Sequence, residues 1–317
     1  MQPIRLEPNL LERFYRGGER IARFRGLAPV ERRPEDWVGS ATTARDDARV
    51  GLSTLPDGRL LRDAVAAEPE AFLGREHVAA FGPEPALLVK LLDAGERLPV
   101  HLHPDRAFAR EHLGSRFGKA EAWLVLEGGT LHVGFREDVE PATLRSWFEA
   151  QDVEAMLAAS NELQVERGDC VYVPAGTPHA IGEGVFMLEV QEPSDLGVLV
   201  EFERFTSREG ATMGLPVETA LAATRTAAVP EEELASWRRA RSLPAESERF
   251  FRVEWGRGGS FDPSFAILVA VDGAGRLETE AGVLDLARGD TVLVPFGAGA
   301  GELSAGVETI RCLPPRP

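Results

Sequence analysis

The sequence predicts a mainly β protein made of two β-barrels with short inserted helices, and three observations support this prediction. Short apolar stretches recur along the 317 residues and are separated by turns rich in glycine and proline. The order of strands and turns in the first half recurs near the C-terminus, as expected for an internal repeat. The helical patterns are short and lie between predicted strands.

Residues 1–205 are predicted to form the first barrel. Their first fifty residues mix β-like stretches with glycine and arginine, which we interpret as strands and turns. Residues 61–81 have helical spacing, and Pro69 and Gly74 are expected to break them into two short helices. Residues 85–104 predict a buried strand, a turn and a strand that carries histidines. A second helical insertion is expected at 141–161, where apolar residues recur every three or four positions.

Residues 206–248 are rich in Ala, Glu, Arg and Pro and predict a helical linker, followed by the second barrel at 249–317. Both barrels contain strand, glycine turn, strand, and then an Arg-Gly-Asp step into an apolar run that ends in Pro and Gly. In the second copy no histidine follows Pro295 and Gly297. We therefore expect the second barrel to be degenerate and free of metal.

Composition limits the functional classes. The net charge of −16 repels nucleic acid and anionic membrane surfaces, so neither is expected as a partner, and an anionic small substrate would need a local cluster of arginines. The sequence has no apolar run of about 20 residues and no apolar signal segment, which predicts a cytoplasmic protein outside the membrane. With two cysteines, a disulfide framework is excluded, and Cys170 is interpreted as core packing. The oligomeric state stays open.

A metal site is indicated by four residues. His101 and His103 are two apart, so on a strand their side chains share one face. Glu121 opens a predicted strand, and His179 ends the turn that begins at Pro174. Three imidazoles and one carboxylate suit Zn, and also Fe, Mn or Co.

These residues resemble the two motifs of the cupins. The first motif is similar to Gly95, His101, His103, Glu121 and Gly128, and the second to the segment from Gly168 to His179. In the second motif, Glu183 replaces the usual downstream Asn, which is not a ligand in the family. The resemblance implies that His101, His103, Glu121 and His179 bind one divalent metal.

The long spacer between His103 and Glu121 is similar to that of the type I mannose-6-phosphate isomerases. Gly118, Lys119, Glu121 and Trp123 match one segment of this family. The N-terminal segment and the stretch from Glu189 to Asp195 resemble two other parts of it. The resemblance implies a zinc-dependent aldose-ketose isomerase that interconverts mannose 6-phosphate and fructose 6-phosphate through an enediol. It makes Glu189, Asp195 and Lys119 the candidates for proton transfer, substrate orientation or charge stabilisation.

The sequence departs from this family at two positions. His101 stands where the family has Gln, which leaves the identity of the metal open. Leu199 stands where the family has a substrate-site Arg, and Arg16 or Arg204 is expected to supply the phosphate-binding charge instead. An isomerase for another sugar, a non-catalytic metal-containing sugar-binding protein and an iron oxygenase are therefore kept as alternatives.

Overall fold

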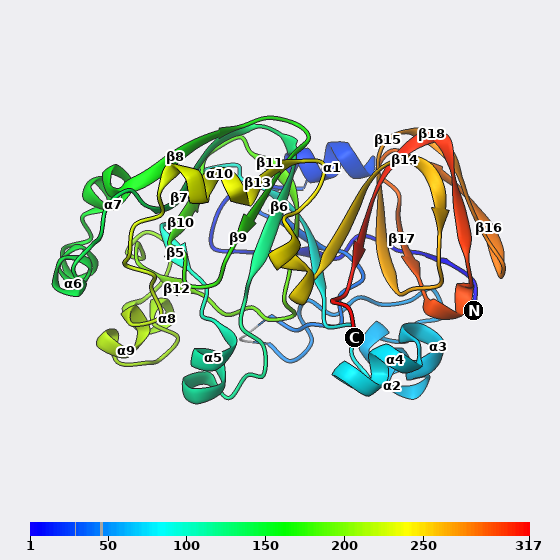
Figure 1. Ribbon diagram of the computed structural model, residues 1–317, viewed down its shortest axis with the longest axis horizontal. Coiled ribbons are helices and arrows are strands. Elements are labelled where there is room, and N and C mark those ends of the chain that lie inside the picture. The colour runs from blue at the N-terminus through cyan, green and yellow to red at the C-terminus, as the bar shows by residue number, and fades with distance from the viewer. Residues whose placement is uncertain (29, 45–46) are drawn as a thin grey trace.

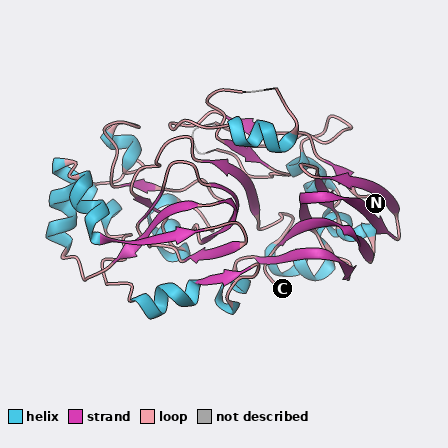
Figure 2. Cartoon of the chain, turned by 90° about the horizontal axis from the view of Figure 1, so that it is seen from above, coloured by secondary structure: helices cyan, strands magenta, loops and turns pink. Residues whose placement is uncertain are grey.

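The computed structural model describes residues 1–28, 30–44 and 47–317, and it confirms a mainly β fold. Figure 1 shows two groups of sheets side by side: two sheets of the N-terminal half, and one sheet of the C-terminal half near which both chain ends lie. The view from above shows the helices around the outside of the strands (Figure 2). The strands that carry the candidate site therefore lie in the interior of the molecule.

The N-terminal half contains a seven-stranded sheet and a five-stranded sheet. In spatial order the first comprises β13 (Arg238–Ala240), β9 (Asp169–Val173), β6 (Glu121–Glu127), β11 (Phe186–Gln191), β4 (Leu88–Asp93), β3 (Glu35–Trp37) and β2 (Leu10–Leu11). The second comprises β12 (Val198–Leu199), β5 (His101–Leu102), β10 (His179–Ile181), β7 (Gly129–Phe135) and β8 (Ser160–Val165). The predicted metal ligands are divided between these two sheets.

The C-terminal sheet has six strands. Its order is β1 (Ile4–Arg5), β17 (Thr291–Val294), β15 (Ala266–Thr279), β18 (Gly301–Leu313) and β14 (Arg252–Phe261), and β16 (Gly282–Ala287) also pairs with β15. One hydrophobic core runs from the seven-stranded sheet into this sheet, since Trp123, Cys170, Ile267 and Cys312 all belong to it. The two halves therefore share buried apolar surface, which stabilises their association.

The predicted Arg-Gly-Asp repeat corresponds to the same kind of turn at two places in the chain. Gly168 and Gly289 both adopt a left-handed backbone, with φ of 99° and 93°, one and two residues before the starts of β9 and β17. Each following Asp accepts a backbone hydrogen bond of 2.8 Å, from Glu166 to Asp169 and from Ala287 to Asp290. Glycine is required here because other residues rarely adopt this conformation.

Most helices lie in the predicted insertions and in the linker, but one helix near the N-terminus and one in the spacer between His103 and Glu121 lie outside them. The helices are α1 (Glu19–Arg25), α2 (Leu61–Ala67), α3 (Pro69–Leu73), α4 (Arg75–Phe81), α5 (Arg106–Leu113), α6 (Pro141–Ala150), α7 (Val153–Ala159), α8 (Arg208–Ala211), α9 (Val217–Leu221) and α10 (Glu231–Trp237), with 3-10 turns η1 (Ala245–Arg249) and η2 (Phe296–Ala298). Within the described part of the chain, none of the helices has the length and hydropathy needed to cross a bilayer.

Three details differ from the sequence-based expectations. The segment 61–81 forms three helices because Pro69 begins α3 at its first turn and Gly74 separates α3 from α4. The N-terminal segment contains the unpredicted helix α1, whose Ile21, Ala22 and Phe24 are buried. In addition, β1 pairs with β17, so the first residues of the chain complete the C-terminal sheet.

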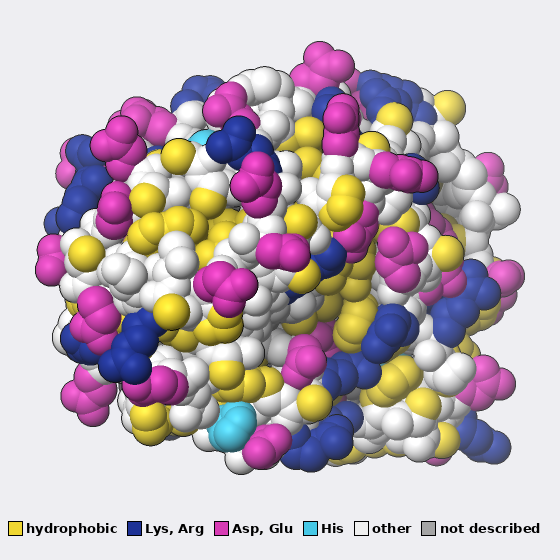
Figure 3. Space-filling model, turned by 60° about the vertical axis from the view of Figure 1, so that its left-hand side comes forward, with side chains coloured by type: hydrophobic (Ala, Val, Ile, Leu, Met, Phe, Trp, Pro, Cys, Tyr) yellow, Lys and Arg dark blue, Asp and Glu magenta, His cyan; other side chains and the backbone are white. Residues whose placement is uncertain are grey.

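Charged side chains are distributed over the surface. On the face in Figure 3, acidic and basic groups alternate over most of the area.

Candidate functional site

Three of the six histidines meet between the two N-terminal sheets. His179 on β10 is the register partner of His101 on β5, and their Nε2 atoms are 3.0 Å apart. His103 follows β5 by one residue, and one nitrogen of each of the three rings lies within 4.8 Å of the others. The His-x-His spacing thus brings both side chains to one face, as the sequence predicts.

Each of these rings is held by a backbone carbonyl at its other nitrogen. The Nδ1 atoms of His101, His103 and His179 lie 2.8, 2.7 and 2.9 Å from the carbonyl oxygens of Pro99, Leu196 and Thr177. Because a carbonyl only accepts, each Nδ1 carries the proton, which leaves each Nε2 with a lone pair that can accept a hydrogen bond or coordinate a metal. This is the usual support for histidines that bind a metal.

Glu121, at the start of β6, contributes a carboxylate to the same group. Its oxygens lie 3.1 Å from His103 Nε2 and 3.3 Å from His179 Nε2, and Trp123 Nε1 donates to it at 3.1 Å. A tetrahedral zinc site with bonds of about 2.05 Å has donor-donor edges of about 3.3 Å. Two different oxygens of Glu121 thus face two of the rings, and the three-histidine group is compatible with a single metal site.

Burial and neighbouring charges together favour the forms of His101, His179 and Glu121 that bind a cation. Burial lowers the pKa of His179 to about 3 and, together with the His179 ring, lowers the pKa of His101 well below its usual value. Burial alone would raise the pKa of Glu121, but nearby Lys119 and His103 reverse this and lower the pKa well below its usual range. Neutral imidazoles and a carboxylate are suitable metal ligands.

Two buried lysines and Glu189 lie beside the ligand group. On neighbouring strands, Lys90 of β4 is the register partner of Glu189 of β11, and Lys90 Nζ lies 3.2 Å from Glu189 Oε1. Lys119 Nζ is 3.6 Å from the same oxygen and donates at 2.6 Å to both His103 Nε2 and Glu121 Oε2. These are the sequence's two lysines, and both are buried here.

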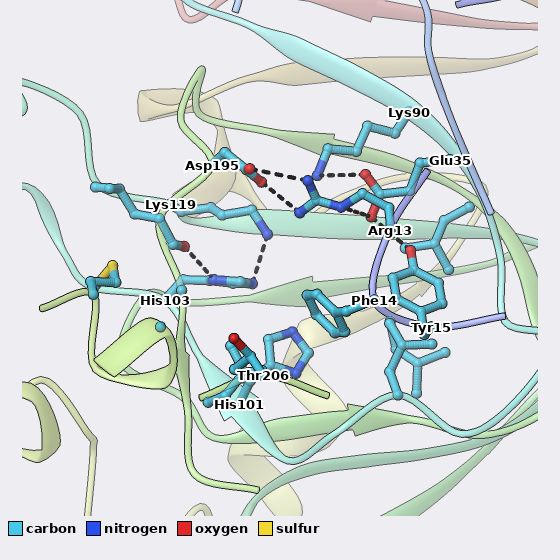
Figure 4. A pocket seen from close by; sticks show the side chains of 18 of the residues that line it. Arg13, Phe14, Tyr15, Glu35, Lys90, His101, His103, Lys119, Asp195 and Thr206 are labelled. Carbon is cyan, nitrogen blue, oxygen red and sulfur yellow. Dashed lines mark hydrogen bonds and ion pairs between the residues drawn. The ribbon is translucent and has the colours of Figure 1, made fainter. Parts of the chain in front are cut away.

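A cavity of about 610 Å³ opens over these groups. Lys119, Glu189 and Asp195 line it together with His101 and His103. Figure 4 shows the side chains of Asp195, Lys119 and both histidines directed toward the same space. The structure therefore brings all three predicted catalytic candidates to one cavity next to the candidate ligands.

Arg16 and Arg204 do not lie in this cavity. Both side chains are exposed, at 70% and 69%, and both pair with Glu96. Leu199 lines the cavity and is the register partner of His101. That Arg16 or Arg204 supplies a substrate-binding charge stays a prediction, and both guanidinium groups lie beside the Glu96 carboxylate, which is 14% exposed.

The structure adds a polar cluster that sequence reasoning missed. Glu35 accepts hydrogen bonds from Tyr15 Oη at 2.7 Å and from Trp37 Nε1 at 2.6 Å, and lies 3.3 Å from Arg13 Nε. Burial raises the pKa of Glu35, but Arg13 and Lys90 outweigh it and lower the pKa to about 2. One signal was available in the sequence: Glu35 and Trp37 alternate on a strand as His101 and His103 do.

Comparison with known proteins agrees with this architecture, although no protein-family model matches the chain. Mannose-6-phosphate isomerase of Streptococcus mutans is 29% identical over 325 residues, covering 98% of this chain and 97% of that protein. GmuF of Bacillus subtilis, a probable mannose-6-phosphate isomerase, is 30% identical over 227 residues, covering 69% of this chain and 67% of that protein. The chain belongs to the mannose-6-phosphate isomerase family.

Solved structures of mannose 6-phosphate isomerases have the same fold as this chain. Mannose 6-phosphate isomerase from Bacillus subtilis superposes with a TM-score of 0.78 at 24% identity, covering 98% of this chain and 99% of that chain. A mannose 6-phosphate isomerase bound with zinc and yttrium superposes with a TM-score of 0.75 at 17% identity, covering 99% of this chain and all of the other. These two structures therefore confirm the fold, and the relatives in sequence confirm the predicted family.

Proposed function

We propose that the protein is a metal-dependent aldose-ketose isomerase that interconverts mannose 6-phosphate and fructose 6-phosphate. The observation that carries this proposal is the joining of a four-donor ligand group to a cavity with Lys119, Glu189 and Asp195, in a chain of this family. We assign His101, His103, Glu121 and His179 as the metal ligands. Zinc is the proposed metal, because these donors are the nitrogen and oxygen atoms that zinc binds in proteins.

The reaction moves a proton between C1 and C2 of the sugar. When bound, the metal would polarise the sugar oxygens and stabilise the negative charge of an enediolate. Glu189 is assigned as the proton-transfer group, because its carboxylate is at the cavity wall and two ammonium groups hold it in place at 3.2 and 3.6 Å. Lys119 is assigned to stabilise charge on the substrate, and Asp195 to accept hydrogen bonds from its hydroxyl groups.

The test is direct turnover. Purified protein loaded with zinc is incubated with mannose 6-phosphate, and fructose 6-phosphate is measured. Activity that disappears in His103→Ala and in Glu189→Gln supports the proposal, because these variants remove a ligand and the proton-transfer group respectively. Absence of fructose 6-phosphate across the pH range with stoichiometric zinc bound rejects it.

An isomerase acting on another sugar is the second candidate. Leu199 favours it, because this cavity wall is apolar where the family has an arginine, and Arg16 and Arg204 lie outside the cavity. Comparison of kcat/KM for mannose 6-phosphate and for unphosphorylated aldoses separates the two candidates. A preference of tenfold or more for an unphosphorylated sugar selects the second.

We also propose that the protein acts in the cytoplasm on a free sugar phosphate, without nucleic acid or membrane partners. Its net charge of −16 supports this, because anionic polymers and surfaces are repelled. Fractionation of cells that produce the protein tests the location. Recovery in the membrane fraction rejects that part of the proposal.

A further inference from the structure

A short turn connects the wall of the cavity to a candidate metal ligand. The carbonyl of Leu196 accepts the Nδ1–H of His103 at 2.7 Å. His103 packs directly on this turn, since a Cβ built on Gly197 would lie 3.4 Å from its Nδ1. The direction of the His103 ring therefore depends on where residues 194–197 lie.

One side of the turn is held by neutral hydrogen bonds. Ser194 Oγ donates to the carbonyl of Gly118 at 2.6 Å, and Gln191 Nε2 donates to the carbonyl of Ser194 at 2.7 Å. The next residue, Asp195, has its carboxylate in the cavity. The position of this carboxylate is set by a different part of the chain.

Arg13 lies in the N-terminal segment, 182 residues before Asp195, and forms an ion pair with the Asp195 carboxylate. Its two terminal nitrogens donate to the two carboxylate oxygens at 3.2 and 3.0 Å, so the contact is bidentate. The guanidinium is itself oriented, because Nε lies 3.3 Å from Glu35 and the rings of Phe14 and Trp37 are each 5.9 Å from Cζ. Figure 4 shows Arg13 between Asp195 and Glu35.

Arg13 differs in its side-chain geometry from the other cations that line the cavity. Of the described residues that line the cavity, it is the one arginine, and the other two cations are Lys90 and Lys119. Lys90 pairs with Glu189 and Glu35, and Lys119 with Glu121 and Glu189. Of these cations, Arg13 supplies a planar donor that binds both oxygens of Asp195, which a lysine cannot replace.

We propose that Arg13 is a positioning residue. Its ion pair with Asp195 holds the 194–197 turn in place, so that the Leu196 carbonyl keeps His103 oriented toward the metal. The inference rests on the metal-ligand assignment of the proposed function, and it connects the N-terminal segment to the ligand group. Without the ion pair between Arg13 and Asp195, the turn can shift, which changes the positions of both the His103 ring and the Asp195 carboxylate. Both zinc affinity and turnover are then expected to fall.

A double-mutant cycle tests the proposal. Zinc affinity is measured by chelator competition on metal-free wild type, Arg13→Gln, Asp195→Asn and the double variant, with circular dichroism to confirm folding. Outer contacts to a metal ligand change affinity by about 10–100-fold, so each single variant is expected to bind zinc at least about tenfold more weakly. If Arg13 acts through Asp195, the double variant should be no more than about twofold weaker than Asp195→Asn alone.

The matched control is Arg23→Gln, which removes an exposed arginine that pairs with Glu127. It should bind zinc as wild type does. If Arg13→Gln does not fold, Arg13→Lys replaces it, because lysine keeps the charge but has no planar fork. Zinc affinity that is unchanged in the Arg13 variant overturns the proposal, and so do losses that multiply in the double variant.

Turnover separates this inference from the proposed function. If wild type isomerises mannose 6-phosphate, kcat/KM of Arg13→Gln should fall at least about tenfold, again with no further loss when combined with Asp195→Asn. If wild type does not isomerise this sugar, the proposed function fails while the zinc measurements still decide the role of Arg13. A loss of turnover at wild-type zinc affinity would show that Arg13 does not act through the turn.

Discussion

Replacing Glu35 by glutamine should destabilise the protein strongly, although the substitution changes almost no volume. The carboxylate is 4% exposed. It accepts hydrogen bonds from Tyr15 and Trp37 and pairs with Arg13 and Lys90, at 3.3 and 3.8 Å. The variant removes the negative charge and leaves these two buried cations with one partner fewer.

Two arguments give the magnitude. Breaking a buried ion pair by removing one partner costs about 3–5 kcal/mol. Independently, the pKa of Glu35 is lowered from 4.5 to about 2. A shift of that size corresponds to about 3 kcal/mol favouring the charged form. We therefore expect the free energy of unfolding at pH 7 to fall by about 3–4 kcal/mol in Glu35→Gln.

The pH dependence provides an internal check. A carboxyl group with a lowered pKa in the folded state contributes stability above its unfolded pKa of 4.5, and this contribution is lost as pH falls toward about 2. The difference between wild type and Glu35→Gln should therefore narrow through this window. The other carboxyl groups are common to both proteins and cancel in the difference.

Urea unfolding followed by tryptophan fluorescence measures the effect. Glu127→Gln is the control, because Glu127 is 41% exposed and its pair with Arg23 lies at the surface. The control should change stability by less than about 1 kcal/mol. A loss below about 1 kcal/mol for Glu35→Gln, or a difference that does not change between pH 4.5 and 2, would refute the reasoning.

Three further predictions follow from the site. His103→Ala and His179→Ala should each lose bound metal while keeping the fold, as judged by elemental analysis and circular dichroism; stoichiometric metal in both would contradict the ligand set. Cys170→Ser should retain turnover, since burial raises the pKa of this thiol to about 12; loss of turnover in a folded variant would give the thiol a chemical role. Metal-free protein should lose stability as pH falls from 6.5 toward 3, because unfolded His179 binds a proton that the folded form, with pKa about 3, does not. Acid titration of wild type and His179→Ala checks this, and equal pH dependence would count against it.

Local pattern was sufficient to find the ligand group. Alternation placed His101 and His103 on one face, the motif pattern added Glu121 and His179, and the structure brings the three histidines together beside Glu121. The glycine turns were also readable, because a left-handed backbone restricts the residue type at Gly168 and Gly289. Such features depend on a few neighbouring residues, so the sequence contains them directly.

Local pattern was insufficient for the arginines. Arg13 and Arg16 lie three residues apart in a segment that the sequence predicts only as strands and turns, yet Arg13 lines the cavity and Arg16 is exposed. The helix α1 was missed for a related reason. It is only seven residues long, and the glycines at its two caps, Gly18 and Gly26, are also typical of turns. Tertiary packing decides which side of such a segment is buried.

By itself, therefore, the sequence determined the mainly β class, because strand alternation and turn geometry are properties of adjacent residues. Its resemblance to a known family gave the family and the four candidate ligands. Only the tertiary structure decided which charges share the cavity. The contact between Arg13 and Asp195 joins residues 182 positions apart, and Lys90 meets Glu189 because β4 and β11 are neighbours in the sheet. Electrostatic partners depend on distance in space, which sheet order sets and local sequence does not record.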